Sequence, residues 1–152
     1  MKHMALLMAL VLGASPASAQ EAFDLQLDHA TVLTRDLEAS ATFYGEILHL
    51  EALETPWGPT RPVRFFSLGG SRQLHVGLAD GIVAPNKDSH LAFAIQDFDA
   101  YLRFLMDQEI EYADFPGRSS EPQVRPDGVR QVFLQDPDGN WIEINDAVHP
   151  PS

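Results

Sequence analysis

An internal repeat is the feature that most constrains what this 152-residue chain can fold into. Residues 28–39 align without a gap on residues 89–100, and His29 then meets His90 at an offset of 61. The match continues toward the C-terminus at slightly larger offsets, which we attribute to a longer connection and a longer turn in the second copy. A repeat fixes the architecture before any local assignment, because each copy is one structural unit.

Each copy has the pattern of a strand, a helix and then three strands. Strand-forming residues fill 25–34 and 90–95, and Asp36 and Asp97 follow them as predicted helix N-caps. Further strands are predicted near 63–68, 72–78, 129–135 and 140–146, with loops at 56–62 and 115–128. The expected fold class is α+β. Two βαβββ modules, about 24–80 and about 88–146, should pair into one curved, barrel-like mixed sheet with the helices outside.

The N-terminal segment 1–19 has the features of a secretory signal peptide. A short polar start precedes an apolar run from Met4 to Leu12, and Ala17-Ser18-Ala19 fits the small-x-small cleavage rule. Nine apolar residues are too few to span ~30 Å of hydrocarbon. We therefore expect a secreted or periplasmic protein whose residues 20–152 form a single domain, with no membrane span after cleavage.

Charge and cysteine content exclude several classes of function. The formal net charge is −12 and the pI is about 4.6. Such a chain repels phosphate backbones and anionic lipid, so we expect no nucleic-acid partner. The sequence contains no cysteine, which excludes disulfides, thiolate metal sites and thiol catalysis.

Four residues with metal-binding side chains fall at equivalent places in the two copies. The repeat pairs His29 with His90, and His75 with Glu143. In three of the four strands, alternation places the ligand-type side chain on a small or polar face and the bulky aliphatic residues on the other. Imidazole nitrogens and carboxylate oxygens bind zinc, nickel and ferrous iron. The pattern predicts one divalent metal site made of His29, His75, His90 and Glu143.

Four stretches of the chain resemble the vicinal oxygen chelate superfamily, which includes glyoxalase I, bleomycin-resistance proteins and extradiol dioxygenases. They are LDHATVLTRDLEASATFYGEILHLE (27–51), RQLHVGLAD (72–80), SHLAFAIQDFDAYLRFLMDQ (89–108) and RQVFLQDPDGNWIEIND (130–146). The resemblance implies ligands from the first, fourth, fifth and eighth strands, and these positions are again His29, His75, His90 and Glu143. It also implies a metal that chelates two neighbouring oxygens of a small-molecule substrate.

The resemblance favours a glyoxalase-like lyase or isomerase in which Glu143 is both metal ligand and general base. Zinc or nickel is the expected metal, with iron and manganese as alternatives. Arg64 and Arg130 are candidates to receive a substrate anion, with surface strand charges as the competing interpretation. Trp57, Tyr112 and Trp141 are candidate pocket aromatics, with core packing as the competing interpretation.

Two other functions remain open from the sequence. His29, His90 and Glu143 alone form a 2-His-1-carboxylate set, which suits a ferrous extradiol-type dioxygenase. A non-enzymatic, resistance-type binding protein is the third candidate. The two modules either close one site within the chain or exchange between the protomers of a homodimer, and the sequence is compatible with both.

Overall fold

The computed structural model describes residues 26–56, 58, 62–83 and 85–149. The signal-peptide segment 1–19 and Trp57 therefore lie outside the described residues. No helix within the described ranges is long and apolar enough to cross a bilayer.

The two βαβββ modules predicted from the repeat are present. The first contains β1 (His29–Thr34), α1 (Leu37–Thr42), a π-helical continuation η1 (Phe43–Ile47), β2 (Ala52–Leu53), β3 (Val63–Ser67) and β4 (Gln73–Leu78). The second contains β5 (His90–Ala94), α2 (Phe98–Asp107), β6 (Gln123–Val124), β7 (Arg130–Gln135) and β8 (Trp141–Asn145). β6 lies inside the segment 115–128 that the sequence analysis treated as a loop, since two residues carry too little alternation to be recognised.

The predicted helix N-caps are confirmed in both modules. Asp36 accepts hydrogen bonds from the backbone N–H groups of Glu38 and Ala39, and Asp97 accepts one from that of Ala100. These bonds satisfy backbone donors that have no partner inside a helix. The two helices therefore begin at equivalent positions of the repeat.

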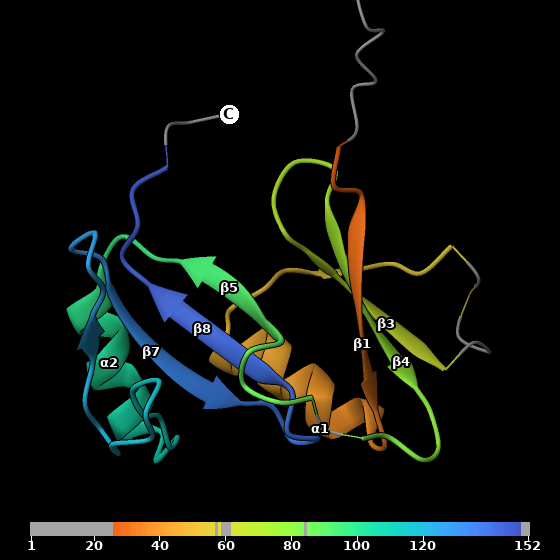
Figure 1. Ribbon diagram of the computed structural model, residues 1–152. Helices are drawn as coiled ribbons and strands as arrows, with labels where there is room; N and C mark the ends of the chain where they lie inside the picture. The colour runs from red at the N-terminus through yellow and green to blue at the C-terminus, as the bar shows by residue number, and fades with distance from the viewer. Residues whose placement is uncertain (1–25, 57, 59–61, 84, 150–152) are drawn as a thin grey trace, which may run out of the picture.

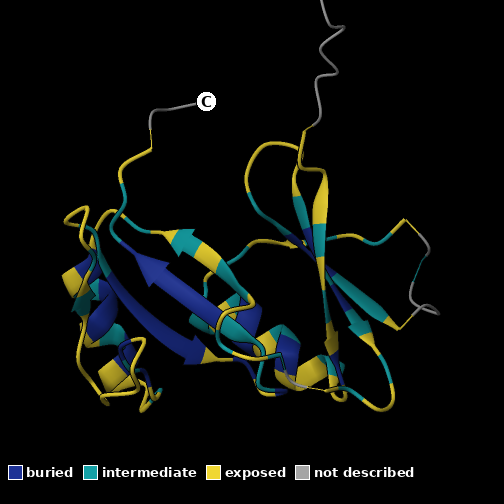
Figure 2. Ribbon diagram, viewed as in Figure 1, coloured by how far each residue is buried: buried dark blue, intermediate teal, exposed yellow. Residues whose placement is uncertain are grey.

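The strands form two four-stranded mixed sheets of identical topology, in the orders β1-β4-β3-β2 and β5-β8-β7-β6. The α+β fold of paired modules is thus confirmed, but β1 and β5 each stand at a sheet edge instead of joining one continuous sheet. Figure 1 shows the two sheets standing apart, with α1 near the base between them. Figure 2 shows that β7 and β8 are mostly buried, whereas exposed and half-buried residues alternate along most of β1.

One hydrophobic cluster packs the two modules together. It contains Tyr44 and Phe66 from the first module and Leu105, Val132 and Ile142 from the second. All five side chains are almost completely buried. The aliphatic face of each sheet contributes to this cluster, which leaves the opposite faces for the ligand-type side chains.

The Asp136–Asn140 turn between β7 and β8 attaches the second module to the first. The buried carboxylate of Asp138 accepts hydrogen bonds from the Thr34 hydroxyl (2.6 Å) and from the Arg35 backbone and guanidinium (3.1 and 2.9 Å). The neighbouring carboxylate of Asp136 accepts one from the Tyr44 hydroxyl (2.8 Å). We call these two carboxylates with their partners the inter-module anchor.

Candidate metal site on the open sheet faces

The four predicted ligands lie on the sheet faces that oppose the hydrophobic core. Phe65 and His75 are directly paired across β3 and β4, and Phe133 and Glu143 are paired across β7 and β8. Ala92 of β5 is paired with Glu143 from the other side. The alternation read from the sequence therefore gives the correct face for each of these strands.

The second module brings His90 and Glu143 into contact. His90 Nε2 lies 3.2 Å from Glu143 Oε2, and the Glu143 side chain is only 7% exposed. His90 Nδ1 donates a hydrogen bond to the Lys87 backbone carbonyl (2.8 Å), which leaves Nε2 of the neutral ring without a proton. Two electron-pair donors then face each other, so a shared proton or a cation belongs between them. Two atoms each bonded at ~2.1 Å to one ion lie roughly 3–3.5 Å apart, and this pair fits a divalent metal.

The first module brings His29 and His75 together in a stack of rings. Their ring centroids lie 4.3 Å apart, and Phe65 stacks on the other face of His75 at 3.9 Å. His29 Nδ1 donates a hydrogen bond to the Asp28 carboxylate (2.6 Å), so Nε2 is the ring nitrogen of His29 that this bond does not use. An outer partner that fixes one ring nitrogen is the usual arrangement for a metal-binding histidine. His29 therefore resembles His90 in its hydrogen bonding.

His75 differs from the other two histidines. Its Nε2 donates to the side-chain oxygen of Gln73 (3.0 Å), so this nitrogen is already used. Burial and then the neighbouring His29 charge lower the pKa of His75, which keeps its ring neutral. The ring packs between His29 and Phe65 as a neutral aromatic side chain. This environment sets His75 apart from His29 and His90.

The single chain does not bring the two pairs together. Among the described residues, no group of three or more histidine, aspartate and glutamate side chains could hold one metal ion. His29 and His75 belong to one sheet, and His90 and Glu143 belong to the other. The shared metal site remains a prediction, and within one protomer only its two halves are present.

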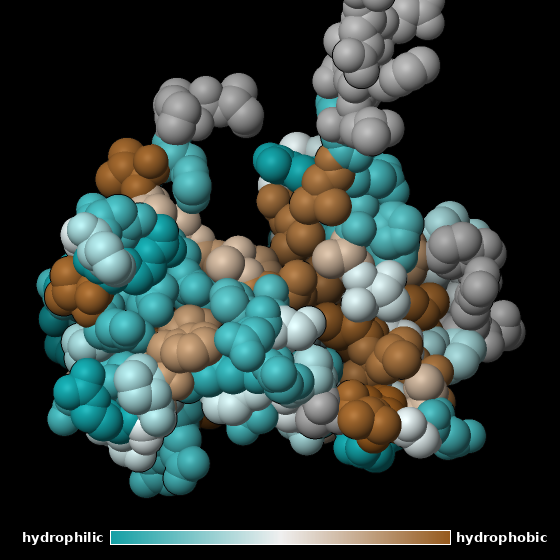
Figure 3. Space-filling model, viewed as in Figure 1, coloured by the Kyte–Doolittle hydropathy of each residue, from teal (hydrophilic) through white to brown (hydrophobic). Residues whose placement is uncertain are grey.

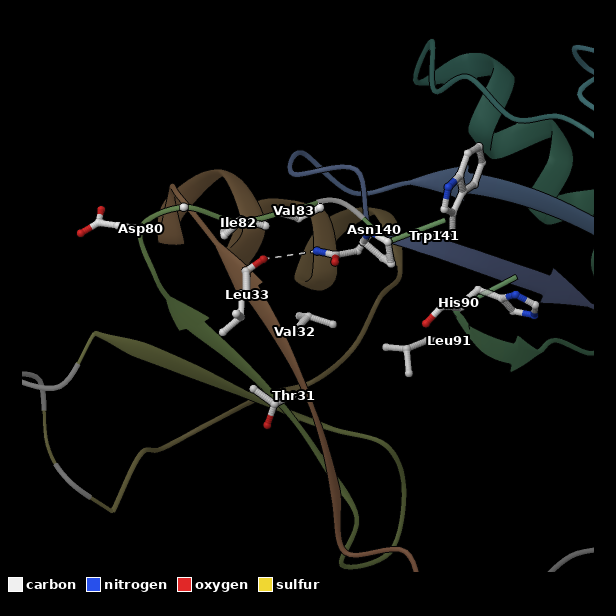
Figure 4. Close-up of a pocket in the computed structure, with 13 residues that line it drawn as sticks. Thr31, Val32, Leu33, Asp80, Ile82, Val83, His90, Leu91, Asn140 and Trp141 are labelled. Carbon is white, nitrogen blue, oxygen red and sulfur yellow. Dashed lines mark hydrogen bonds between the residues drawn. The ribbon is translucent and has the colours of Figure 1, made fainter. Parts of the chain in front are cut away.

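A cavity of about 400 Å³ lies where the two modules approach each other. Its walls include Thr31 and Leu33 of β1, Ile82 of the connection, and His90 and Trp141 of the second module. Figure 4 shows these residues around the cavity, with the Asn140 side-chain amide donating to the Leu33 carbonyl (3.3 Å). Trp141 is thus one predicted pocket aromatic that the structure places beside a candidate ligand.

Lys87 fixes the segment that precedes β5. Its Nζ donates to the carbonyls of Asp114 (2.6 Å) and Phe115 (3.1 Å). It also lies 4.5 Å from the ring centroid of Trp141 and 4.9 Å from that of Phe133, within the range of cation–π attraction. Burial lowers the pKa of Lys87. These contacts hold in place the Lys87 carbonyl that accepts the His90 hydrogen bond.

Arg64 and Arg130 lie on the opposite sheet face from the ligands, which does not fit the predicted anion-binding role. Arg64 is paired with Val76 of the core face and forms an ion pair with Glu38. Arg130 donates to Asp146 (2.7 Å) and Asp99 (2.8 Å) and lies over the Phe98 ring. Both arginines instead fit the competing interpretation, that of strand charges paired with surface carboxylates.

Tyr112 is a core residue, because it is 7% exposed and belongs to the hydrophobic cluster. This position fits the competing interpretation, core packing.

The arginine that lies beside Glu143 is Arg125, whose Nη1 is 3.5 Å from Glu143 Oε1. Sequence reasoning missed it inside the segment 115–128. Asn145 also donates to Glu143 Oε1 (2.7 Å), and its position two residues along the same strand was the available signal.

Comparison with known proteins agrees with this fold. The family model for the Glyoxalase/Bleomycin resistance protein/Dioxygenase superfamily matches residues 26–144, and the chain belongs to this superfamily. The solved structure of Oxidase ChaP-H2 is 27% identical with a TM-score of 0.69, covering 84% of this chain and 97% of that one.

Two further relatives match at similar levels. A Bacillus anthracis protein assigned to the glyoxalase family is 26% identical with a TM-score of 0.70, covering 85% of this chain and all of that one. The uncharacterized protein YwbC of Bacillus subtilis (strain 168) is 26% identical over 125 residues, which are 78% of this chain and 95% of YwbC. Superfamily members are often metal-dependent enzymes.

Proposed function

We propose that this protein is a ferrous-iron enzyme of the oxygenase or oxidase type, acting on a small substrate with two neighbouring oxygens. The observation that carries this proposal is the different hydrogen bonding of the three histidines. His29 and His90 each have Nδ1 fixed by an outer acceptor, whereas His75 uses Nε2 on Gln73. With Glu143, the first two form a 2-His-1-carboxylate set that leaves coordination positions open. The similarity to Oxidase ChaP-H2 supports the same choice.

The chain's own residues would prepare the site in defined ways. Bound iron would supply Lewis acidity and one-electron chemistry with dioxygen. Lys87 and Asp28 orient the two imidazoles through their Nδ1 atoms. Asn145 fixes Glu143 Oε1, so that Oε2 is the oxygen presented to His90 and to the ion.

A glyoxalase-like lyase or isomerase is the second candidate, and the position of His75 favours it. The ring of this histidine lies 4.3 Å from that of His29. If its Nε2 turned from Gln73 to the ion, His75 would be a fourth ligand suited to zinc or nickel. The identity of the bound metal distinguishes the two candidates. Iron held by three ligands indicates oxygen chemistry, whereas zinc or nickel held by four indicates the lyase or isomerase. A protein that takes no metal would instead be a binding protein.

We further propose that a homodimer completes the site, with the His29 half from one protomer and the His90–Glu143 half from the other. β1 and β5 are both sheet-edge strands, and an unpaired edge favours association. Three leucines on or beside β1 and β4, at positions 27, 33 and 78, are 46–65% exposed. Figure 3 shows apolar side chains gathered over the part of the visible surface that β1 occupies.

A mixing experiment tests both the ligands and their arrangement. The His29→Ala and His90→Ala homodimers should each bind almost no iron, because each site loses one ligand. After partial unfolding and joint refolding, hybrid dimers should regain one intact site, since one protomer keeps His29 and the other keeps His90. Iron bound per dimer, measured by elemental analysis, reports the recovery.

The matched control mixes His90→Ala with Glu143→Ala. Both changes fall in the same half of the site, so every hybrid site lacks one ligand and no metal should be recovered. If neither mixture recovers bound metal although the wild type binds it, the complete site lies within one chain. A wild type that binds no metal under any loading condition would contradict the enzyme proposal.

We also propose that the protein is exported and cleaved after Ala19, from the apolar run and small-x-small motif of the first 19 residues. Mass spectrometry of the native protein should find an N-terminus at Gln20. A full-length species confined to the cytoplasm would contradict export.

A further inference from the structure

Arg125 is held in a rigid turn beside Glu143. Its backbone N–H donates to the Val129 carbonyl (2.8 Å), and its own carbonyl accepts from Gly128 (2.9 Å). Gly128 has a φ of 88°, which favours glycine at this position of the turn. The guanidinium forms two bonds with the Asp127 carboxylate, one of them from Nε at 3.2 Å. The turn therefore fixes the direction of the Arg125 side chain.

The remaining nitrogen of this guanidinium faces the candidate metal ligand. Nη1 lies 3.5 Å from Glu143 Oε1, the oxygen that also accepts from Asn145. Glu143 Oε2 points instead to His90. The Arg125 side chain is 35% exposed, so it can be reached from solvent although Glu143 is buried. Nη1 is thus the donor available to a group that approaches Glu143 from outside.

Two buried amides extend the polar surface next to Arg125. Gln131 and Asn145 are directly paired across β7 and β8 and are 7% and 6% exposed. Gln131 donates to Gln123 of β6 (3.3 Å), so the hydrogen-bonding side chains continue from Glu143 to the sheet edge. Buried amides supply both donors and acceptors, which suits an oxygen-rich ligand.

The local charges make anion binding here depend on the metal. The hydrogen bond from Arg125 holds the pKa of Asp127 below its usual range, so this carboxylate is ionised at neutral pH. One guanidinium and the carboxylates of Asp127 and Glu143 carry a formal charge of −1, which repels a further anion. A divalent ion bound to Glu143 makes the local charge positive. Arg125 can then attract an acid group of a ligand in addition to the carboxylate of Asp127.

We propose that Arg125 anchors an acidic substituent of the substrate, so that the preferred substrates carry a carboxylate a few bonds from the two chelating oxygens. This inference rests on the proposed metal function and adds its substrate class. Arginine suits the task because its guanidinium stays charged and keeps Nη1 as a donor while Nε and Nη2 bind Asp127. The subsite should form only when the metal is bound.

The test compares two hydroxamates of equal chain length on the cobalt(II)-loaded protein. Succinic monohydroxamate and butanehydroxamate chelate through the same two oxygens, but only the first ends in a carboxylate. We expect the wild type to bind succinic monohydroxamate about tenfold more tightly, which corresponds to ~1.4 kcal/mol. Changes in the cobalt absorption spectrum give both dissociation constants.

In the Arg125→Gln variant the two constants should become equal, while Arg125→Lys should keep part of the preference. Arg103→Gln, on the exposed surface of α2, is the matched control and should keep the full ratio. Cobalt content and melting curves are measured first for every variant. If Arg125→Gln loads cobalt and retains the tenfold ratio, the subsite is wrong and the metal proposal stands. If the wild type binds no cobalt, both are overturned.

Discussion

The Asp138→Ala variant is expected to lose about 2–4 kcal/mol of unfolding free energy and to melt roughly 5–15 °C below the wild type. The Asp138 carboxylate is buried and accepts hydrogen bonds from Thr34 and from two groups of Arg35, in a different module. Its removal leaves the buried Thr34 hydroxyl and the Arg35 backbone N–H without this acceptor. Such losses cost more than the mean value of a hydrogen bond. Urea unfolding followed by circular dichroism measures the change.

Two further variants separate the anchor from general charge effects. Asp107→Ala removes an exposed carboxylate at the end of α2 and should change stability little in this acidic chain. Asp138→Asn keeps the shape and one acceptor oxygen, so it should fall between the alanine variant and the wild type. Equal stability of Asp138→Ala and Asp107→Ala would show that the anchor contributes nothing.

Saturating metal is expected to stabilise the wild type by ~2.7 kcal/mol when the free ion is at 100 times its dissociation constant. The reason is that His29, His90 and Glu143 are far apart in sequence, so only folded protomers in the proposed arrangement would bring them together. A chelator should therefore lower the melting temperature by several degrees. Melting curves with ferrous iron or cobalt, with and without chelator, provide the measurement.

The corresponding ligand variants should not respond to metal or chelator. His90→Ala removes an imidazole that faces Glu143 at 3.2 Å, whereas His149→Ala removes an exposed imidazole near the C-terminus. The first variant should melt at one temperature under both conditions, and the second should behave as the wild type. A chelator response that survives in His90→Ala would exclude this histidine as a ligand.

The repeat allowed much of the fold to be predicted from the sequence. Equivalent aspartates gave both helix N-caps, and alternation gave the sheet face opposite the hydrophobic cluster for His75, His90 and Glu143. These features depend on neighbours within one strand or one helix turn. The same reasoning could not show that β1 and β5 remain sheet edges, because edge pairing depends on contacts between modules.

The surroundings of the candidate site could not be predicted from the sequence, and its ligand set of His29, His75, His90 and Glu143 remains a prediction. Arg125 reaches Glu143 from a turn 18 positions earlier, and the sequence does not encode that approach as a local pattern. Arg64 and Arg130 lie on the other sheet face and fit the competing interpretation of surface strand charges, because a shift of one residue along a strand changes the face of the side chain. Hydrogen bonding distinguishes His75 from His29, although both are strand histidines.

The inter-module anchor implies that the two copies of the duplicated unit tolerate change differently. The β7–β8 turn, residues 136–140, holds the buried carboxylates that contact the first module. Its counterpart between β3 and β4, residues 68–72, contains Gly69 and Gly70 with nothing packed where their side chains would be. Extra residues or a fused peptide should therefore be accommodated at 69–70, while the same insertion at 137–139 should prevent the modules from docking. In this respect the two modules are not interchangeable, although they share one topology.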